Sequence, residues 1–179
     1  MTKQLKTLFL ILLLSFINKA QVLDLPPRPA EALSGSELAE LVWDYNLTDR
    51  ENEIYAQILI GNVPNFQRNL VPVTFNQTLN SVDYEITYYV IPDYLAVGAD
   101  TNYFLMPMTP ILAQKICNQL NFTLPTRKMV NQIWSNATVK LSPSPIPPSP
   151  AMTTIPVMWQ HNLIVRDQRE AEILSLIHI

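Results

Sequence analysis

The sequence predicts a single α+β domain with N-terminal helices, a small antiparallel sheet, a helical hairpin and a proline-rich strap. Apolar residues have helical spacing from residue 38 to 59, alternate between 82 and 90, and return to helical spacing after residue 109. Helices and strands that follow one another in separate runs are typical of an α+β fold, because a parallel sheet needs strands and helices in alternation.

The first 20 residues have the pattern of a secretory signal peptide. Lys3 and Lys6 precede an apolar run from residue 8 to 17, and Ala20 is a small residue at the expected cleavage point before Gln21. The run is about ten residues long, whereas a membrane span needs roughly 20. An uncleaved membrane anchor is the alternative. We therefore expect a secreted protein, periplasmic or extracellular, with no transmembrane segment after cleavage.

The charge of the chain argues against a nucleic-acid partner, and its cysteine content argues against a disulfide. The chain has 12 basic and 15 acidic residues, and removing the three lysines of the signal (Lys3, Lys6 and Lys19) leaves nine basic residues against 15 acidic ones. A net charge of about −6 argues against nucleic acid, which attracts basic surfaces. The partner is therefore expected to be an extracellular ligand of unknown type. Cys117 is the only cysteine, so no intrachain disulfide forms, and its apolar helical surroundings indicate a core residue.

The first third of the chain predicts an extended lead-in and two helices. Residues 21–33 contain Pro26, Pro27 and Pro29, which disfavour regular structure. Two capping boxes follow, one from Ser34 to Glu37 and one from Thr48 to Glu51, and each is expected to begin a helix. The second helix is expected to end at Gly61.

The middle of the chain predicts strands. Residues 70–75 and 82–91 are rich in β-branched and aromatic side chains, and Asn80-Ser81 between them fits a hairpin turn. Residues 94–97 and 103–106 predict two shorter strands joined by residues 98–102. We expect these strands to form one small antiparallel sheet.

Helical spacing returns in the last third. Thr109-Pro110 is expected to cap one helix and Pro125 to open another, so that the two pack as a helical hairpin. Residues 142–150 read SPSPIPPSP and predict a polyproline strap or linker. After it, residues 155–159 are expected to form a strand and residues 160–172 a helix.

The last six residues, 174–179, read LSLIHI, which resembles a translated adaptor of the kind used in sequencing libraries. On this interpretation residues 34–173 form an incomplete domain, the protein is truncated at its C-terminus, and His178 is not a candidate ligand or base. A natural apolar tail is the alternative.

Standard catalytic signatures do not occur in the sequence. It contains no G-x-S-x-G, H-E-x-x-H, P-loop or dinucleotide motif, and three glycines are too few for a phosphate-binding loop. His161, within WQHN, is the best catalytic candidate, because histidine exchanges protons near neutral pH. A hydrogen-bonded structural histidine is the alternative. No metal site is predicted, and the cofactor is unknown.

Four further residues are binding candidates. Arg127 and Lys128 lie at a helix start, where cations oppose the helix dipole, and such local conflicts sometimes mark anion sites. Arg166 is expected on one face of the last helix, and Asp100 in a loop between strands. Ordinary surface charge is the alternative for Arg127 and Lys128, and solvated ion pairs with Asp167 and Glu170 are the alternative for Arg166.

Three blocks of residues resemble those of a known family. They are YLAVG at 94–98 with MPMTP at 106–110, then LPTRKMV at 124–130, and then IPPSPAMTT at 146–154. These blocks are similar to those of a family of uncharacterised secreted bacterial proteins. The resemblance implies export and a longer chain with further His and Asp residues, but it carries no activity to any residue.

Two hypotheses for the function remain. The first is a hydrolase that acts on cell-wall or polysaccharide material, and it requires His161, Arg127 and a loop aspartate in one cleft. The second is a non-catalytic extracellular binding or surface-associated module. It requires exposed aromatic side chains in a shallow groove, for which four tyrosines are candidates: Tyr88, Tyr89, Tyr94 and Tyr103.

Overall fold

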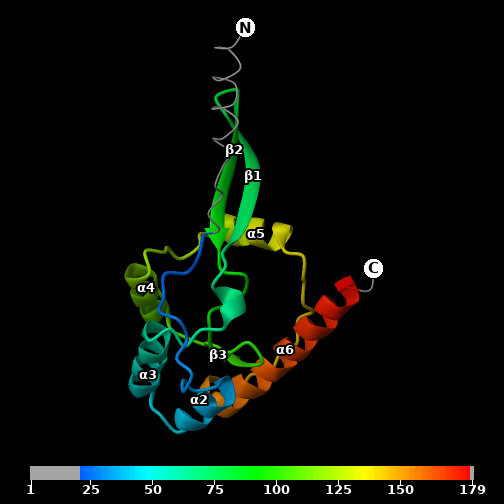
Figure 1. The fold of residues 1–179 in the computed structure, drawn as a ribbon. Helices are drawn as coiled ribbons and strands as arrows, with labels where there is room; N and C mark the ends of the chain where they lie inside the picture. The colour runs from blue at the N-terminus through cyan, green and yellow to red at the C-terminus, as the bar shows by residue number, and fades with distance from the viewer. Residues whose placement is uncertain (1–20, 178–179) are drawn as a thin grey trace, which may run out of the picture.

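The computed structural model describes residues 21–177, so the predicted signal peptide (1–20) and residues 178–179 lie outside the described part (Figure 1). Within that part the chain forms five α-helices and two separate two-stranded antiparallel sheets, which confirms the α+β class. The elements are α2 (Gly35–Leu41), α3 (Leu47–Leu59), η1 (Asn65–Gln67), β1 (Val71–Leu79), β2 (Val82–Val90), β3 (Ala96–Ala99), β4 (Asn102–Leu105), α4 (Pro110–Gln119), α5 (Arg127–Asn136), η2 (Pro150–Thr153) and α6 (Ile155–Ile177).

The core lies between the helices and the short β3–β4 hairpin. Helix α2 packs on β3 and β4, α3 packs on α4 and β3, and α6 packs on α2 and β4 (Figure 1). Helices α2, α3, α4 and α6 contribute apolar residues at i, i+3 or i+4 to this centre, whereas α5 contributes none. The central buried side chains are Leu38, Val42, Ile54, Ile58, Val63, Val97, Phe104, Leu112, Ile116 and Ile155.

The helix starts follow local capping chemistry, with one correction. Ser34 and Glu37 form the predicted capping box at the start of α2. Helix α3, however, begins at Leu47, and its N-cap is Asn46, whose side chain accepts a hydrogen bond from the N–H of Asp49 at 3.0 Å. The prediction of a capping box starting at Thr48 was wrong, because asparagine two residues earlier is an equally good cap and extends the helix.

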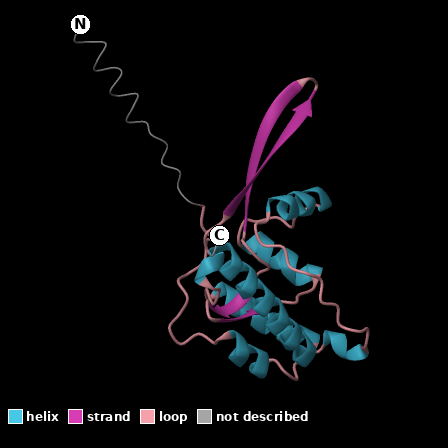
Figure 2. Cartoon of the chain, turned by 90° about the vertical axis from the view of Figure 1, so that its right-hand side faces the viewer, coloured by secondary structure: helices cyan, strands magenta, loops and turns pink. Residues whose placement is uncertain are grey.

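Strands β1 and β2 form a long hairpin that projects from the body of the molecule (Figures 1 and 2). Asn80 and Ser81 form its two-residue turn with φ of 50° and 64°, the backbone that type I′ turns require. The predicted turn is thus confirmed, but β1 continues to Leu79, beyond the predicted limit at Phe75. Every β1 residue from Val71 onward pairs with a β2 residue, and this pairing extends the strand.

Strands β3 and β4 pair only with each other. The expected single sheet is therefore two sheets. Gly98 in β3 has φ of 125° and lies against Gly35 at the start of α2, where an added Cβ would be 2.7 Å from the Gly35 nitrogen. Helix α2 therefore approaches the hairpin as closely as two backbones allow.

Helices α4 and α5 are capped by Thr109 and Thr126, and Pro110 occupies the first turn of α4 as predicted. Pro125 lies outside α5, because Thr126 is the residue that accepts from the Met129 N–H. The two helices have different packing partners, since α4 packs on α3 and α5 packs on β1. The prediction that these two helices pack together as a helical hairpin was therefore wrong.

Helix α6 is continuous from Ile155, so the predicted strand at 155–159 was wrong. Pro156 explains the outcome, because proline fits the first turn of a helix but removes a donor from a strand. Ile155 is buried and Trp159 packs edge-on against Phe104 with ring centroids 5.3 Å apart. The proline-rich strap leads into η2 and contacts α6 through a hydrogen bond from Ser142 N to Gln168 Oε1 (3.1 Å).

Candidate functional site

A groove lies between α6, the proline-rich strap and the end of β4. Its volume is about 470 Å³. Pro145 and Ile146 of the strap form one wall and the first two turns of α6 form the other. The lining residues are Leu105, Pro107, Pro145, Ile146, Met152, Val157, Met158, His161 and Asn162. Seven of these nine side chains are apolar, which is the composition of a small-molecule binding site.

His161 is the polar group of this groove that is open to a ligand. It is half-buried on the second turn of α6, and no hydrogen bond or ion pair to its imidazole is present within residues 21–177. Both ring nitrogens can therefore serve a ligand, one as donor and the other as acceptor in the neutral form.

Asn162, the other polar lining residue, has its hydrogen bonds occupied. It is buried, its Nδ2 donates to the carbonyl of Tyr103 at 3.1 Å, and its Oδ1 accepts from the N–H of Leu105 at 2.9 Å. These bonds attach α6 to the outer edge of β4. Asn162 therefore fixes the position of His161, its neighbour in sequence, and adds no free group to the groove.

Arg166 and Arg169 belong to a separate cluster farther along α6. Arg166 Nη2 donates to the carbonyl of Thr101 at 2.8 Å, and its guanidinium lies 4.7 Å from the centre of the Tyr103 ring. Arg169 donates to the Tyr103 hydroxyl at 3.1 Å and pairs with Asp93 at 3.5 Å. Stacking on aromatic rings and bonding to fixed carbonyls are structural uses of arginine.

Asp93 is the titratable partner in that cluster. Burial raises the pKa of Asp93, while a hydrogen bond from the N–H of Tyr94 and the charge of Arg169 oppose the rise. The Asp93 carboxylate does not line the His161 groove.

Asp100 connects the β3–β4 turn to η1. Its carboxylate accepts from Asn65 Nδ2 at 3.1 Å and from the N–H of Phe66 at 3.2 Å. The carbonyl of Thr101, the next residue, accepts the hydrogen bond from Arg166. Asp100 and Arg166 therefore both stabilise the β3–β4 turn.

Arg127 and Lys128 lie at the start of α5, beneath the projecting hairpin. Lys128 Nζ donates to Gln77 Oε1 at 2.9 Å and stands 5.5 Å from the centre of the Phe75 ring. Arg127 is exposed, and its side chain makes no hydrogen bond or ion pair within residues 21–177. Neither residue lines the groove at His161. The five sequence candidates therefore occupy three places: the groove (His161), the β3–β4 turn (Arg166 and Asp100) and the start of α5 (Arg127 and Lys128).

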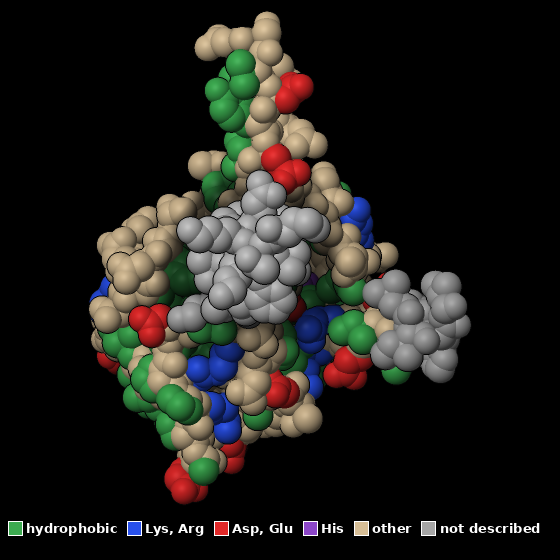
Figure 3. All heavy atoms as spheres, turned by 45° about the horizontal axis from the view of Figure 1, so that its top comes forward, with side chains coloured by type: hydrophobic (Ala, Val, Ile, Leu, Met, Phe, Trp, Pro, Cys, Tyr) green, Lys and Arg blue, Asp and Glu red, His purple; other side chains and the backbone are tan. Residues whose placement is uncertain are grey.

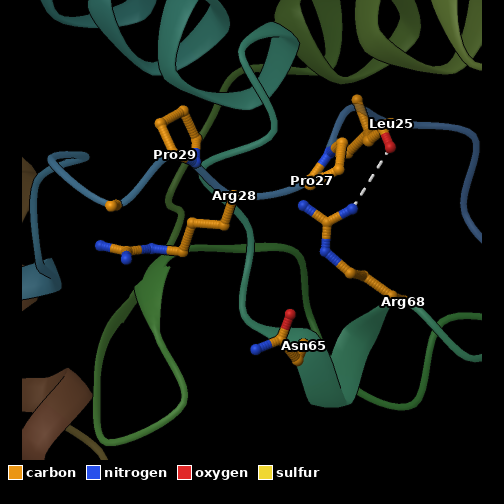
Figure 4. A pocket seen from close by; sticks show the side chains of 7 residues that line it. Leu25, Pro27, Arg28, Pro29, Asn65 and Arg68 are labelled. Carbon is orange, nitrogen blue, oxygen red and sulfur yellow. Dashed lines mark hydrogen bonds between the residues drawn. The ribbon is translucent and has the colours of Figure 1, made fainter.

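A second hollow of about 450 Å³ lies beside the lead-in (Figure 4). It contains two arginines, Arg28 and Arg68, that the sequence interpretation missed. Arg28 donates to the carbonyls of Ala32, Leu33 and Gly98, and Arg68 donates to those of Leu25, Pro26 and Gly61. Burial lowers the pKa of Arg68, and the charge of Asp100 opposes this shift.

The two arginines replace backbone pairing that the prolines prevent. Leu23 is buried in the core, and the lead-in pairs with the body through the Val22–Asn69 bridge. After that bridge, carbonyls of the lead-in accept hydrogen bonds from the guanidinium groups of Arg28 and Arg68. The partners of the two arginines are loop carbonyls and the Gly98 carbonyl of β3, at separations from 4 to 70 residues, and no recognised sequence motif specifies such bonds.

The tyrosines named for a binding groove differ in exposure. Tyr94 is 81% exposed and Tyr89 is 38% exposed, whereas Tyr103 is buried at 2%. Tyr88 is half-buried, and its hydroxyl donates to the carbonyl of Met129 at 3.2 Å. They do not line the groove of His161.

Residues 21–177 contain no group of three side chains placed to hold a metal ion. In the same range no helix has the length and apolar character needed to cross a membrane. Comparison with protein-family models, with curated proteins and with solved structures found no match to this chain.

Proposed function

We propose that the mature protein is an extracellular, non-catalytic binding protein, and that the groove between α6 and the proline-rich strap holds a small aliphatic carboxylate. The observation that carries the proposal is a groove of about 470 Å³ with apolar walls and one free polar side chain, His161. The apolar walls suit the body of such a ligand, and the imidazole suits its charged end.

The walls favour binding because they are stiff. Pro107 and Pro145 have fixed φ angles, and Ile146 is half-buried. A site whose walls are ordered before the ligand arrives loses less conformational entropy on binding. Met152 and Met158 add flexible thioethers that adapt to the shape of an aliphatic chain.

A carboxylate is the end group that this groove fits best. The lining contains no aspartate or glutamate that would repel an anion. An imidazole N–H donates a hydrogen bond and, when protonated, also adds a positive charge. A neutral alcohol of the same length receives only part of this interaction.

The groove supports binding better than hydrolysis. Acid–base hydrolysis uses two titratable groups or a nucleophile with its base, whereas His161 is the only titratable group that lines the groove. Arg127, Asp93 and Asp100, which the hydrolase hypothesis brings to His161, line other surfaces. Hydrolysis of cell-wall or polysaccharide material stays a prediction.

Calorimetric titration of the purified mature protein with hexanoate, octanoate and decanoate tests the proposal, with octanol as the neutral comparison. His161→Leu removes the polar end of the groove and keeps it apolar, so affinity for octanoate should fall by about 10-fold to 100-fold. Gln160→Leu makes a comparable change at the exposed neighbouring position outside the groove, and its affinity should equal that of the parent protein.

Two outcomes contradict the proposal. One is an absence of measurable binding for the whole acid series. The other is equal loss of affinity in His161→Leu and Gln160→Leu, which would place the ligand elsewhere.

A further inference from the structure

The proline-rich strap, residues 142–150, forms one wall of the groove and is attached to the body at its two ends. At its first residue, the Ser142 N–H donates to Gln168 Oε1 of α6 at 3.1 Å. At its other end the chain enters η2, where Arg50 Nη1 of α3 donates to the Thr153 carbonyl at 3.0 Å. Between these points, residues 143–148 make no hydrogen bond to any part of the chain from 21 to 177.

The composition of the strap explains why its middle is unattached. Five of its nine residues are proline, and proline has no N–H to donate. The same residues fix φ, so the segment keeps the extended polyproline conformation at about 3.1 Å per residue. Such a segment behaves as a stiff rod, and any movement is concentrated at its ends.

Side-chain packing holds the strap weakly as well. All five prolines are exposed, and Ile146 is the half-buried apolar side chain of the strap. The bond from Ser142 to Gln168 is also exposed to solvent, where water competes for both partners. Few buried apolar contacts and an exposed backbone are the physical marks of a segment that opens locally at low cost.

Long-range charge offers no strong guide to a ligand that enters the groove. His161 is the one titratable group in the lining, and on the face drawn in Figure 3 acidic and basic side chains are interspersed. Broad fields of a single sign are what draw a charged ligand to a site, and that face has none. The strap is therefore the feature of the groove that is placed to set the rates of entry and release.

We propose that the strap is a movable wall of the groove and that Gln168 is its latch, a positioning residue that acts through Ser142. The inference rests on the proposed function and adds its regulation. In the docked state, Pro145 and Ile146 complete the groove. In a minor undocked state the bond between Ser142 and Gln168 is broken, and the strap has turned as a rod about η2.

The ligand and the strap stabilise each other. A ligand in the groove touches Pro145 and Ile146 only when the strap is docked, so it favours the docked state by its difference in affinity for the two states. Entry and release both pass through the undocked state. A gate of this kind changes the two rate constants together, and their ratio, the dissociation constant, stays nearly the same while the docked state predominates.

Gln168→Ala removes the latch and leaves every lining residue of the groove in place. Loss of one exposed hydrogen bond should raise the undocked population by about 2-fold to 10-fold. The association and dissociation rate constants for octanoate, measured by stopped flow, should rise by the same factor, with the dissociation constant within about 2-fold of the parent. Gln160→Ala, at an exposed position of the same helix, should change neither rate constant.

Double electron–electron resonance follows the strap without any ligand, on protein that begins at Gln21 and carries Cys117→Ala. One spin label is attached at Ser142→Cys, which keeps the backbone donor of the latch, and the other at Glu40→Cys, an exposed position of α2, which packs on α6. Gln168→Ala should enlarge a second, displaced distance. The control Gln160→Ala should give the distances of the parent.

The two measurements separate failure of the gate from failure of the ligand. Identical distance distributions in the parent and in Gln168→Ala overturn the gate, even if octanoate binds. Weaker octanoate binding by Gln168→Ala with an unchanged association rate constant also overturns it, because the glutamine would then act on the shape of the groove alone. If octanoate does not bind, the proposed function fails, and the distances still decide whether Gln168 latches the strap.

Discussion

Gln67 and Asn162 hold the two outer edges of the β3–β4 hairpin in the same way. Gln67 donates to the carbonyl of Tyr94 at 2.6 Å and accepts from the N–H of Ala96 at 2.9 Å. Asn162 makes the corresponding pair with Tyr103 and Leu105. Each side-chain amide thus replaces the peptide group of a missing neighbouring strand, and both are buried.

Removal of either amide should destabilise the fold. Gln67→Ala and Asn162→Ala each leave a backbone N–H and a carbonyl without partners in the interior, at about 1–3 kcal/mol for each unsatisfied group. Urea unfolding followed by circular dichroism gives the free energy of unfolding. Gln168→Ala, which affects only the exposed bond to Ser142, is the control on α6. Equal stability of Asn162→Ala and this control would argue against the strand-like role.

Gly98 should not tolerate a side chain. A Cβ on Gly98 would lie 2.4 Å from the Asn102 carbonyl oxygen and 2.7 Å from the Gly35 nitrogen, at φ of 125°. Gly98→Ala is therefore expected to lower the free energy of unfolding by roughly 2–4 kcal/mol, through strain and separation of α2 from the hairpin. Glu40→Ala, at an exposed position of α2, should change it by under about 0.5 kcal/mol. A Gly98→Ala protein as stable as its parent would contradict the close approach.

Mutations at the start of α3 test whether Asn46 or Thr48 caps the helix. Asn46→Ala removes the bond to the Asp49 N–H and should destabilise the protein by about 0.5–2 kcal/mol. Thr48→Ala changes a residue inside the first turn and should be close to neutral. Thermal unfolding of the two variants measures both effects. A larger destabilisation by Thr48→Ala than by Asn46→Ala would contradict the assignment of Asn46 as the cap.

Asp93 should make stability depend on pH. Its pKa in the folded chain is raised above the ordinary 3.8, mainly by burial, so the folded chain holds the proton more tightly than the unfolded chain. The contribution of this group to the free energy of unfolding therefore falls as pH rises from about 3.8, and levels off once the folded carboxyl has ionised too. Asp93→Asn lacks this dependence.

Measuring both proteins from acid to neutral pH tests that sign. The stability of the parent relative to Asp93→Asn should decrease as pH rises through this window. A relative stability that increases instead would mean that the ion pair with Arg169 outweighs the cost of burying the carboxylate.

Several features that depend on neighbours in sequence were predicted correctly, although the cap of α3 was not. The capping box at Ser34, the Thr109-Pro110 cap and the Asn80-Ser81 turn all lie where expected. Each rests on bonds or backbone angles within a few residues. The alternation in residues 82–90 likewise identified β2, because period-2 patterning is a direct consequence of strand geometry.

Features that depend on distant partners were not predictable. The side chains of Arg28, Arg68, Gln67 and Asn162 bond to carbonyl or N–H groups of other loops and of β3 and β4, and the spacing of residues in the sequence does not indicate these partners. For the same reason the sequence could not show that the candidate site residues lie apart. Only tertiary packing decides that His161 faces the strap whereas Arg166 faces Tyr103. The identity of His161 as a candidate came from its chemistry alone.

The most direct test of the groove is an amide chemical-shift titration, with octanoate, of ¹⁵N-labelled protein that begins at Gln21. The account predicts shifts centred on Leu105, Ile146, Val157 and His161, which line the groove, with the β1–β2 hairpin unaffected. Shifts that instead centre on Arg127 and Lys128, or an absence of shifts at saturating octanoate, would contradict it.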